Sequence, residues 1–171
     1  MTRDLIPRAD FRDQDFAPFG EFVDRPVAAG SRRMFSHWFG GAGLEPVFHT
    51  NSVRPSDLPV LLTSLEQHPH AAQCFVPLDI SQYLVTVARS DASGAPLLDT
   101  LATFVLPGTR GVIYAKGVWH AAATVLDRVG NFVVLMWRGR ADDDVIVDIP
   151  QHRIVAPAAP SVPRTRDRES A

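Results

Sequence analysis

The sequence is poor in cysteine and has no long apolar run. It holds one cysteine, Cys74, among 171 residues, which excludes an intramolecular disulfide and a cysteine-rich zinc cage. Residues 1–7 lack the apolar core of a secretory signal, and no stretch approaches the roughly 18 apolar residues of a membrane helix. We therefore expect a cytoplasmic protein, in keeping with a reducing compartment, with no membrane partner.

A strong excess of charge of either sign is also missing. The chain has 17 Lys and Arg against 19 Asp and Glu, for a net charge of -2, and it has no basic run. This balance argues against a nucleic-acid partner but allows a small anionic ligand, which one or two arginines can hold. The length predicts a single domain over residues 1–155, followed by a Pro-, Ala- and Arg-rich tail over 156–171 that we expect to be disordered.

The sequence does contain a series of short β-strand patterns separated by turn residues. From residue 72 onward we expect strands at 73–78, 82–88, 102–106, 111–114, 131–137 and 144–149. Clusters of Gly, Pro, Asp and Ser separate these strands at short, even intervals, with no alternating helices. The pattern predicts a mainly β fold, either a sandwich or a closed barrel.

The first half of the chain predicts a hairpin and a helix. Residues 31–39 and 45–54 have strand patterns on either side of two glycines, so His37 and His49 could oppose each other or remain separate, half-exposed strand residues. Residues 56–68 carry four leucines at helical spacing and predict the only substantial helix. Three phenylalanines near the N-terminus are expected in the core: Phe16, Phe19 and Phe22.

Candidate site residues gather around the glycine-bracketed stretch 111–120. Several polar or aromatic side chains could point into a barrel mouth: His68, His70, Gln73, Tyr114, Trp119 and His120. Imidazoles and a carboxamide could bind one divalent metal ion of unknown identity with open coordination positions, and we expect no organic cofactor. The alternative is that His120 merely fills the barrel.

Three cations are candidates for holding a substrate carboxylate. Arg54, Lys116 and Arg138 each follow an apolar, strand-like stretch. The alternative is a solvated charge at the rim, which is the favoured interpretation for Lys116 and Arg138. Cys74 has no evident activating neighbour and is expected to be buried and inert. The acidic run 142–144 is expected to be a solvated turn and not a metal site.

Several motifs resemble those of a known family. They are Phe16-Ala17-Pro18-Phe19-Gly20, Pro55-Ser56-Asp57-Leu58-Pro59, Leu65-Glu66-Gln67-His68-Pro69 running into Gln73-Cys74-Phe75-Val76-Pro77, Gly111-Val112-Ile113-Tyr114 with Val118-Trp119-His120, and then Arg128-Val129 and Phe132. In their order and separations they resemble the bacterial ureidoglycolate lyase family of the cupin superfamily. The resemblance implies a cupin-like antiparallel β-barrel (a double-stranded β-helix, or jelly roll) and a homodimer.

The resemblance also implies a reaction, the cleavage of ureidoglycolate to glyoxylate and urea in allantoin degradation, a part of purine metabolism. Breaking the C–N bond of this hemiaminal requires a base for the hydroxyl proton and an acid for the departing nitrogen. The implied catalytic residues are His120 and Tyr114, with Tyr114 as the proton donor. The resemblance also implies that His68, Gln73 and His120 face the pocket, where they could bind the metal. Our candidates for binding the substrate, chosen from the residues themselves, are Arg54, Lys116 and Trp119.

The chain departs from the family pattern at several polar positions. Ala115 and Lys116 stand where the family has His-Arg, and Ala121-Ala122 stand where it has His-Pro. Met136-Trp137-Arg138-Gly139 replaces the family's Asp-Arg-Gly-Gly. These changes leave two further hypotheses open. The same barrel could act on a more apolar hydroxy or ureido acid, or it could bind a small molecule without catalysis.

Overall fold

The computed structural model describes residues 2–157, and within them the protein is mainly β. Most of the tail that we expected to be disordered, residues 158–171, lies outside the described residues. Within residues 2–157, no helix is long and apolar enough to span a membrane. The elements are β1 (Arg3–Leu5), α1 (Asp13–Phe16), β2 (Gly20–Val23), η1 (Ser36–Trp38), β3 (Glu45–Val53), β4 (Val60–Gln67), β5 (Gln73–Pro77), β6 (Gln82–Ser90), β7 (Pro96–Pro107), β8 (Gly111–Tyr114), β9 (Trp119–His120), β10 (Thr124–Val125), β11 (Gly130–Arg138) and β12 (Val145–Ile154).

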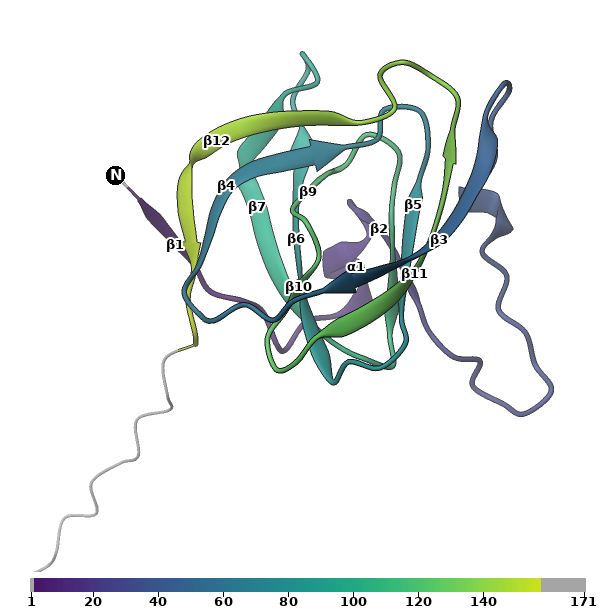
Figure 1. Ribbon diagram of the computed structural model, residues 1–171, viewed down its shortest axis with the longest axis horizontal. Coiled ribbons are helices and arrows are strands. Elements are labelled where there is room, and N and C mark those ends of the chain that lie inside the picture. The colour runs from purple at the N-terminus through teal and green to yellow at the C-terminus, as the bar shows by residue number, and fades with distance from the viewer. Residues whose placement is uncertain (1, 158–171) are drawn as a thin grey trace, which may run out of the picture.

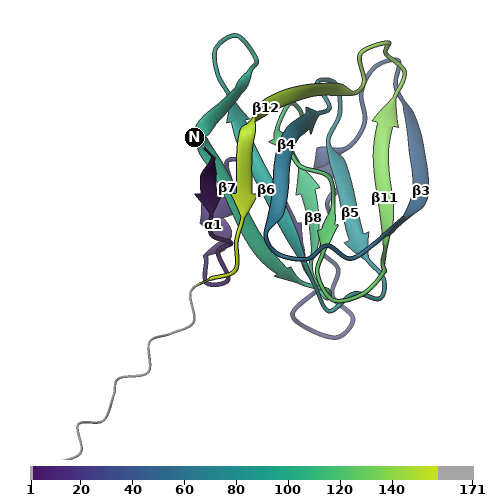
Figure 2. The ribbon, with the colours of Figure 1, turned by 60° about the vertical axis from the view of Figure 1, so that its left-hand side comes forward.

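The strands form two curled sheets. The smaller sheet has five strands in the order β2-β8-β5-β11-β3. The larger sheet has seven, in the order β1-β12-β4-β9-β6-β10, with β7 also paired to β6. Figures 1 and 2 show the smaller sheet facing the larger one, and all pairings of named strands but β1 with β12 are antiparallel. This arrangement confirms the mainly β, cupin-like barrel that the resemblance implied.

Strand β6 is buried on both faces and separates two hydrophobic clusters. Tyr83, Val85 and Val87 pack with side chains of the smaller sheet in the main core. Leu84 and Ala88, which alternate with them, pack in a second cluster formed within the larger sheet. A strand covered on both sides loses the polar-apolar alternation of a half-exposed strand, which explains the continuous apolar run seen in the sequence. The three N-terminal phenylalanines lie in the main core, as predicted: Phe16, Phe19 and Phe22.

The helix predicted over 56–68 is wrong, because most of this segment is strand β4. β4 pairs with β12 along one edge and with β9 along the other, so its backbone groups find partners in the sheet. The register with β12 shifts between Asp148 and His152. Leu62 and Leu65, an odd number of residues apart, are therefore both buried in the second cluster, whereas Leu61 is 58% exposed. A bulge in the partner strand thus imitates helical spacing.

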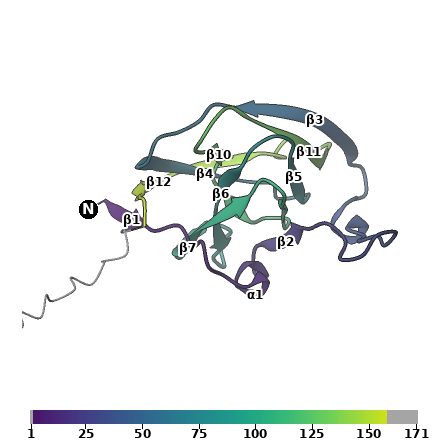
Figure 3. The ribbon, with the colours of Figure 1, turned by 90° about the horizontal axis from the view of Figure 1, so that it is seen from below.

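The hairpin predicted for residues 31–39 and 45–54 is also wrong. Residues 36–38 form the 3₁₀ turn η1, while β3 pairs with β11 and ends the order of the smaller sheet. Aromatic side chains around η1 cover the outer face of the smaller sheet instead of joining it. His37 therefore lies beside Glu21, at 3.4 Å, and does not oppose His49. Figure 3 shows the connection from β2 to β3, which carries η1, running along one side of the barrel.

Candidate functional site

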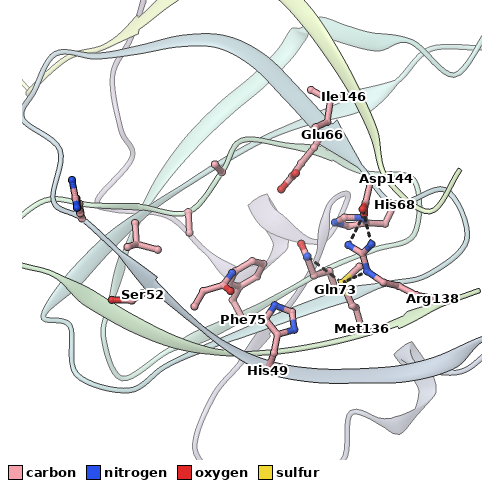
Figure 4. A pocket seen from close by; sticks show the side chains of 15 residues that line it. His49, Ser52, Glu66, His68, Gln73, Phe75, Met136, Arg138, Asp144 and Ile146 are labelled. Carbon is pink, nitrogen blue, oxygen red and sulfur yellow. Dashed lines mark hydrogen bonds and ion pairs between the residues drawn. The ribbon is translucent and has the colours of Figure 1, made fainter. Parts of the chain in front are cut away.

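A cavity of about 520 Å³ opens between the two sheets. Its walls come from β3, β4, β5, β11 and β12, together with the segments that follow β3, β4, β9 and β11. Figure 4 shows its side chains pointing inward from opposite walls. The lining residues are His49, Asn51, Ser52, Val53, Arg54, Glu66, His68, Gln73, Phe75, Ala122, Ala123, Met136, Arg138, Asp144 and Ile146.

Strand pairing brings the polar end of this cavity together. Glu66 on β4 pairs directly with His120 on β9, so both side chains lie on the same face of the larger sheet. His68 follows Glu66 by two residues and reaches the same cavity. Gln73 comes from the smaller sheet, and its Oε1 lies 3.1 Å from His120 Nε2. The cluster therefore joins the two sheets at one point.

His120 is buried among hydrogen-bond acceptors. Its Nδ1 lies 3.1 Å from the carbonyl oxygen of Val118, which assigns a proton to Nδ1. Its Nε2 faces both Gln73 Oε1, at 3.1 Å, and Glu66 Oε1, at 3.3 Å. If Nδ1 carries the only proton, three acceptor atoms meet at this point, and a cation among them would remove the repulsion.

His68 is oriented in the same way. Its Nδ1 lies 2.9 Å from Asp144 Oδ1 and 3.1 Å from the carbonyl oxygen of Asp143. Both partners accept, so Nδ1 carries the proton and Nε2 presents its lone pair. Nε2 is buried and has no hydrogen-bond partner among the described residues. Buried polar atoms are rarely left unpaired, so an orphan lone pair at this position indicates a place for a ligand.

These atoms form a donor set that could bind a metal ion. Ligand atoms of Glu66, His68 and His120 all lie within 4.8 Å of one another. Two imidazole nitrogens and a carboxylate suit a divalent transition metal, and each imidazole is held by an acceptor at its other nitrogen, as metal-bound histidines usually are. Gln73 Oε1 lies beside them and could be a fourth ligand atom. The residues present therefore fit a divalent cation.

The charges around the cluster keep Glu66 ionised. The neighbouring imidazole of His120 lowers the pKa of Glu66, more than burial raises it. Arg138 holds both carboxylate oxygens of Asp144, at 2.6 and 2.8 Å, and this pair closes one side of the cavity. Tyr114 stacks on His120, with ring centroids 4.2 Å apart, and burial raises the pKa of its phenol well above the usual value.

The structure brings together some of the residues singled out in the sequence. His68 and Gln73 line the cavity, and His120 contacts both Gln73 and Glu66 at its end. Arg54 lines the cavity directly after the end of β3. Within residues 2–157, no carboxylate lies within ion-pair distance of Arg54. Arg138 also lines the cavity, but Asp144 already engages it.

Other predicted site residues lie elsewhere. Neighbouring residues of a strand point to opposite faces, so Trp119 is buried in the second cluster and donates a hydrogen bond to the carbonyl of Gly94. Lys116 and His70 line a separate hollow of about 170 Å³ together with Arg140. Tyr114 stacks behind His120 and is not part of the cavity wall.

Several cavity residues were missed in the sequence, among them Glu66, Asp144 and His49. Glu66 stands two residues before His68, and this spacing places both side chains on one face only in a strand. The leucine spacing of residues 56–68 predicts a helix, which would separate them. Asp144 belongs to the run predicted to be a solvated turn, yet it contacts both His68 and Arg138, so that prediction is wrong for Asp144. His49 was assigned to a hairpin that does not form.

Cys74 is buried as expected, and burial raises the pKa of its thiol to about 12.

The fold and the site define a cupin-like β-barrel with a polar cavity, in which Glu66, His68 and His120 could bind a metal ion. The family model described as ureidoglycolate lyase matches residues 4–156, and the chain belongs to this family. A protein named ureidoglycolate lyase from Burkholderia cepacia is 35% identical over 134 residues, covering 70% of this chain and 72% of that protein.

Two further relatives carry the same name. One from Burkholderia mallei (strain NCTC 10229) is 34% identical over 130 residues, covering 70% of this chain and 75% of the relative. One from Escherichia coli (strain SMS-3-5 / SECEC) is 35% identical over 104 residues, covering 61% of this chain and 63% of the relative.

Proposed function

We propose that the protein is a ureidoglycolate lyase, which cleaves ureidoglycolate to glyoxylate and urea. The observation that carries this proposal is the cavity itself. In a chain of this family, it combines a buried cation-binding donor set with an arginine, Arg54, that has no ion-pair partner among the described residues. The substrate has complementary groups, because one carbon bears a carboxylate, a hydroxyl and a ureido nitrogen.

The departures from the family pattern do not strip the cavity of polar groups. Ala115 packs against the main core and Ala121 against the second cluster, so neither residue lines the cavity. Ala122 and Met136 do line it, and the Met136 sulfur accepts a hydrogen bond from Gln73 Nε2 at 3.6 Å. This position therefore still orients the neighbouring carboxamide. The arrangement supports a retained activity over a purely apolar binding pocket.

Substrate binding is assigned to the wall that β3 provides. Arg54 can bind the substrate carboxylate by donating two charge-assisted hydrogen bonds to it. Asn51 and Ser52 line the cavity in the same segment and offer hydrogen bonds to the ureido group. Anchoring the carboxylate on Arg54 fixes the reacting carbon between β3 and the donor set.

The metal site is assigned to His68, His120, Glu66 and Gln73. A divalent cation bound there would act as a Lewis acid on the substrate hydroxyl and make its proton easier to remove. Glu66 points into the cavity, as Figure 4 shows, and its lowered pKa keeps it ionised at neutral pH. A carboxylate has two oxygens, so the one that does not face His120 can accept the hydroxyl proton.

The decisive assay follows urea, glyoxylate and ammonia together. We expect purified protein, loaded with divalent metal, to release urea and glyoxylate in equal amounts from ureidoglycolate, with no ammonia. Ammonia in place of urea would indicate hydrolysis of the ureido group and would contradict the lyase assignment, as would the absence of turnover.

Two matched histidine variants test the site. His68→Gln should lower the rate by at least about 100-fold, because it removes an imidazole from the donor set. His70→Gln changes the neighbouring histidine, which lies outside the cavity, and should retain the rate of the unmodified protein. A far-ultraviolet spectrum of each variant controls for folding, and equal loss in both variants would contradict the placement of the site.

We also propose that the protein is a homodimer, as expected for this family. The outer edge of β3 ends the smaller sheet, and Phe48 on this strand is 71% exposed. An exposed edge strand is a natural surface for pairing with another chain. Sedimentation equilibrium of the full chain would give twice the mass of 18.8 kDa, and a monomer would contradict this proposal.

A further inference from the structure

His49 faces the candidate site from the wall opposite Glu66 (Figure 4). In the antiparallel register of β3 and β11, His49 lies directly opposite Val134. Directly opposed residues point to the same face of a sheet, and Val134 is fully buried in the main core. The imidazole therefore lies on the inner face of the sheet. Figure 4 shows it reaching into the cavity from one side while Glu66 reaches in from the other.

His49 is also the one histidine of the chain without a polar protein contact among the described residues. The other five are each held by a carboxylate or a carbonyl oxygen: His37, His68, His70, His120 and His152. His49 is exposed, because its strand ends the sheet, so solvent reaches its ring. An imidazole that is exposed, lines the cavity and has no protein partner is available to a ligand.

The proposed reaction needs such a group. When the C–N bond breaks, its electron pair goes to the ureido nitrogen, which must gain a proton to leave as urea. Arg54 and Arg138 also line the cavity, but a guanidinium does not give up its proton. His68 and His120 have no proton to give toward the cavity, because Nδ1 of each ring faces an acceptor and holds the proton. Tyr114, the donor implied by the resemblance, stacks behind His120 and does not line the cavity.

We propose that His49 is the catalytic acid that protonates the departing ureido nitrogen, an inference that rests on the lyase function proposed above. The hydroxyl proton passes to Glu66, and the O–H electron pair becomes the second bond of the glyoxylate carbonyl. The C–N bond breaks, and its electrons take the proton from His49, forming urea. Glu66 then returns a proton to solvent and His49 regains one, so the cycle neither consumes protons nor changes an oxidation state.

The test compares His49→Ala and His49→Gln with the unmodified protein, all loaded with metal. Loss of a general acid lowers kcat by about 100-fold to 10,000-fold, and we expect a loss in this range in both variants. Metal content should stay unchanged, because His49 is not in the donor set. In His49→Ala, added imidazole should restore part of the rate, because the vacated space opens to solvent. The matched control is His37→Gln, an exposed histidine outside the cavity, which should keep full activity.

The outcomes separate this inference from the proposed function. Urea release by the unmodified protein together with a His49→Ala rate within threefold of it would overturn the role of His49 and leave the lyase function standing. A loss of rate that imidazole does not restore, or that accompanies loss of metal, would show that His49 acts on the fold and not as an acid. If the unmodified protein releases no urea, both proposals fail together.

Discussion

Asp144 is expected to control metal affinity without contributing much to stability. Asp144 Oδ1 accepts the hydrogen bond from His68 Nδ1, at 2.9 Å, and so directs the Nε2 lone pair toward Glu66 and His120. Asp144→Asn keeps the shape but removes the negative charge that makes the imidazole a better donor. Changes to such supporting carboxylates commonly weaken metal binding 10-fold to 100-fold, or about 1.4 to 2.8 kcal/mol.

The surroundings of His68 narrow the expected weakening of metal binding. The carbonyl oxygen of Asp143 also accepts from His68 Nδ1, at 3.1 Å, so the proton stays on Nδ1 in the variant. We therefore expect the lower end, a roughly 10-fold increase in the dissociation constant. The ion pair of Asp144 with Arg138 joins side chains that are 36% and 41% exposed. Pairs with this exposure contribute at most about 1 kcal/mol, so the free energy of unfolding of the metal-free protein should change little.

The assay titrates chelator-treated protein with Zn²⁺ in competition with a chromophoric chelator, and thermal unfolding is recorded in metal-free buffer. Asp142→Asn is the matched control, because Asp142 holds His70 at 2.8 Å in the same way but lies outside the cavity. Unchanged Zn²⁺ affinity in Asp144→Asn, or equal weakening in both variants, would refute the reasoning. If the unmodified protein binds no Zn²⁺, the assignment of the metal site to Glu66, His68 and His120 is wrong.

Three further predictions follow from the placement of individual side chains. Arg54→Met should lower kcat/KM about 10-fold to 100-fold by removing a charged hydrogen bond, whereas Lys116→Met should leave it unchanged; equal effects in a steady-state assay would contradict the assignment. Trp119→Phe should lower the free energy of unfolding by roughly 1–3 kcal/mol in a urea titration, through lost packing and the lost bond to Gly94, with KM unaffected. Burial raises the pKa of Cys74 to about 12, so at pH 8 a thiol-disulfide exchange reagent should label it only after unfolding, and rapid labelling of the native protein would contradict its burial.

Much of the fold could be predicted from local patterns. Strands from residue 73 onward were expected within a few residues of where they lie, because their turn residues and apolar runs agree with the final sheets. The helix over 56–68 could not be corrected from the sequence, since its leucine spacing depends on a register shift in β12, almost ninety residues away. Residues 31–39 read as a strand because aromatic residues that cover a sheet resemble those that belong to one.

The sequence alone determined the family, the β-rich class and the two motifs that supply His68, Gln73 and His120. Only the tertiary structure decided which of the candidates meet. Trp119 and His120 are neighbours in a strand, so their side chains point to opposite faces of the sheet. The sequence does not say which of the two faces the cavity. The pairing of β4 with β9 brings Glu66 to His120. The packing of the smaller sheet over the larger one brings Gln73 Oε1 to His120 Nε2. The sequence could not predict these contacts, because they join segments that lie far apart in the chain.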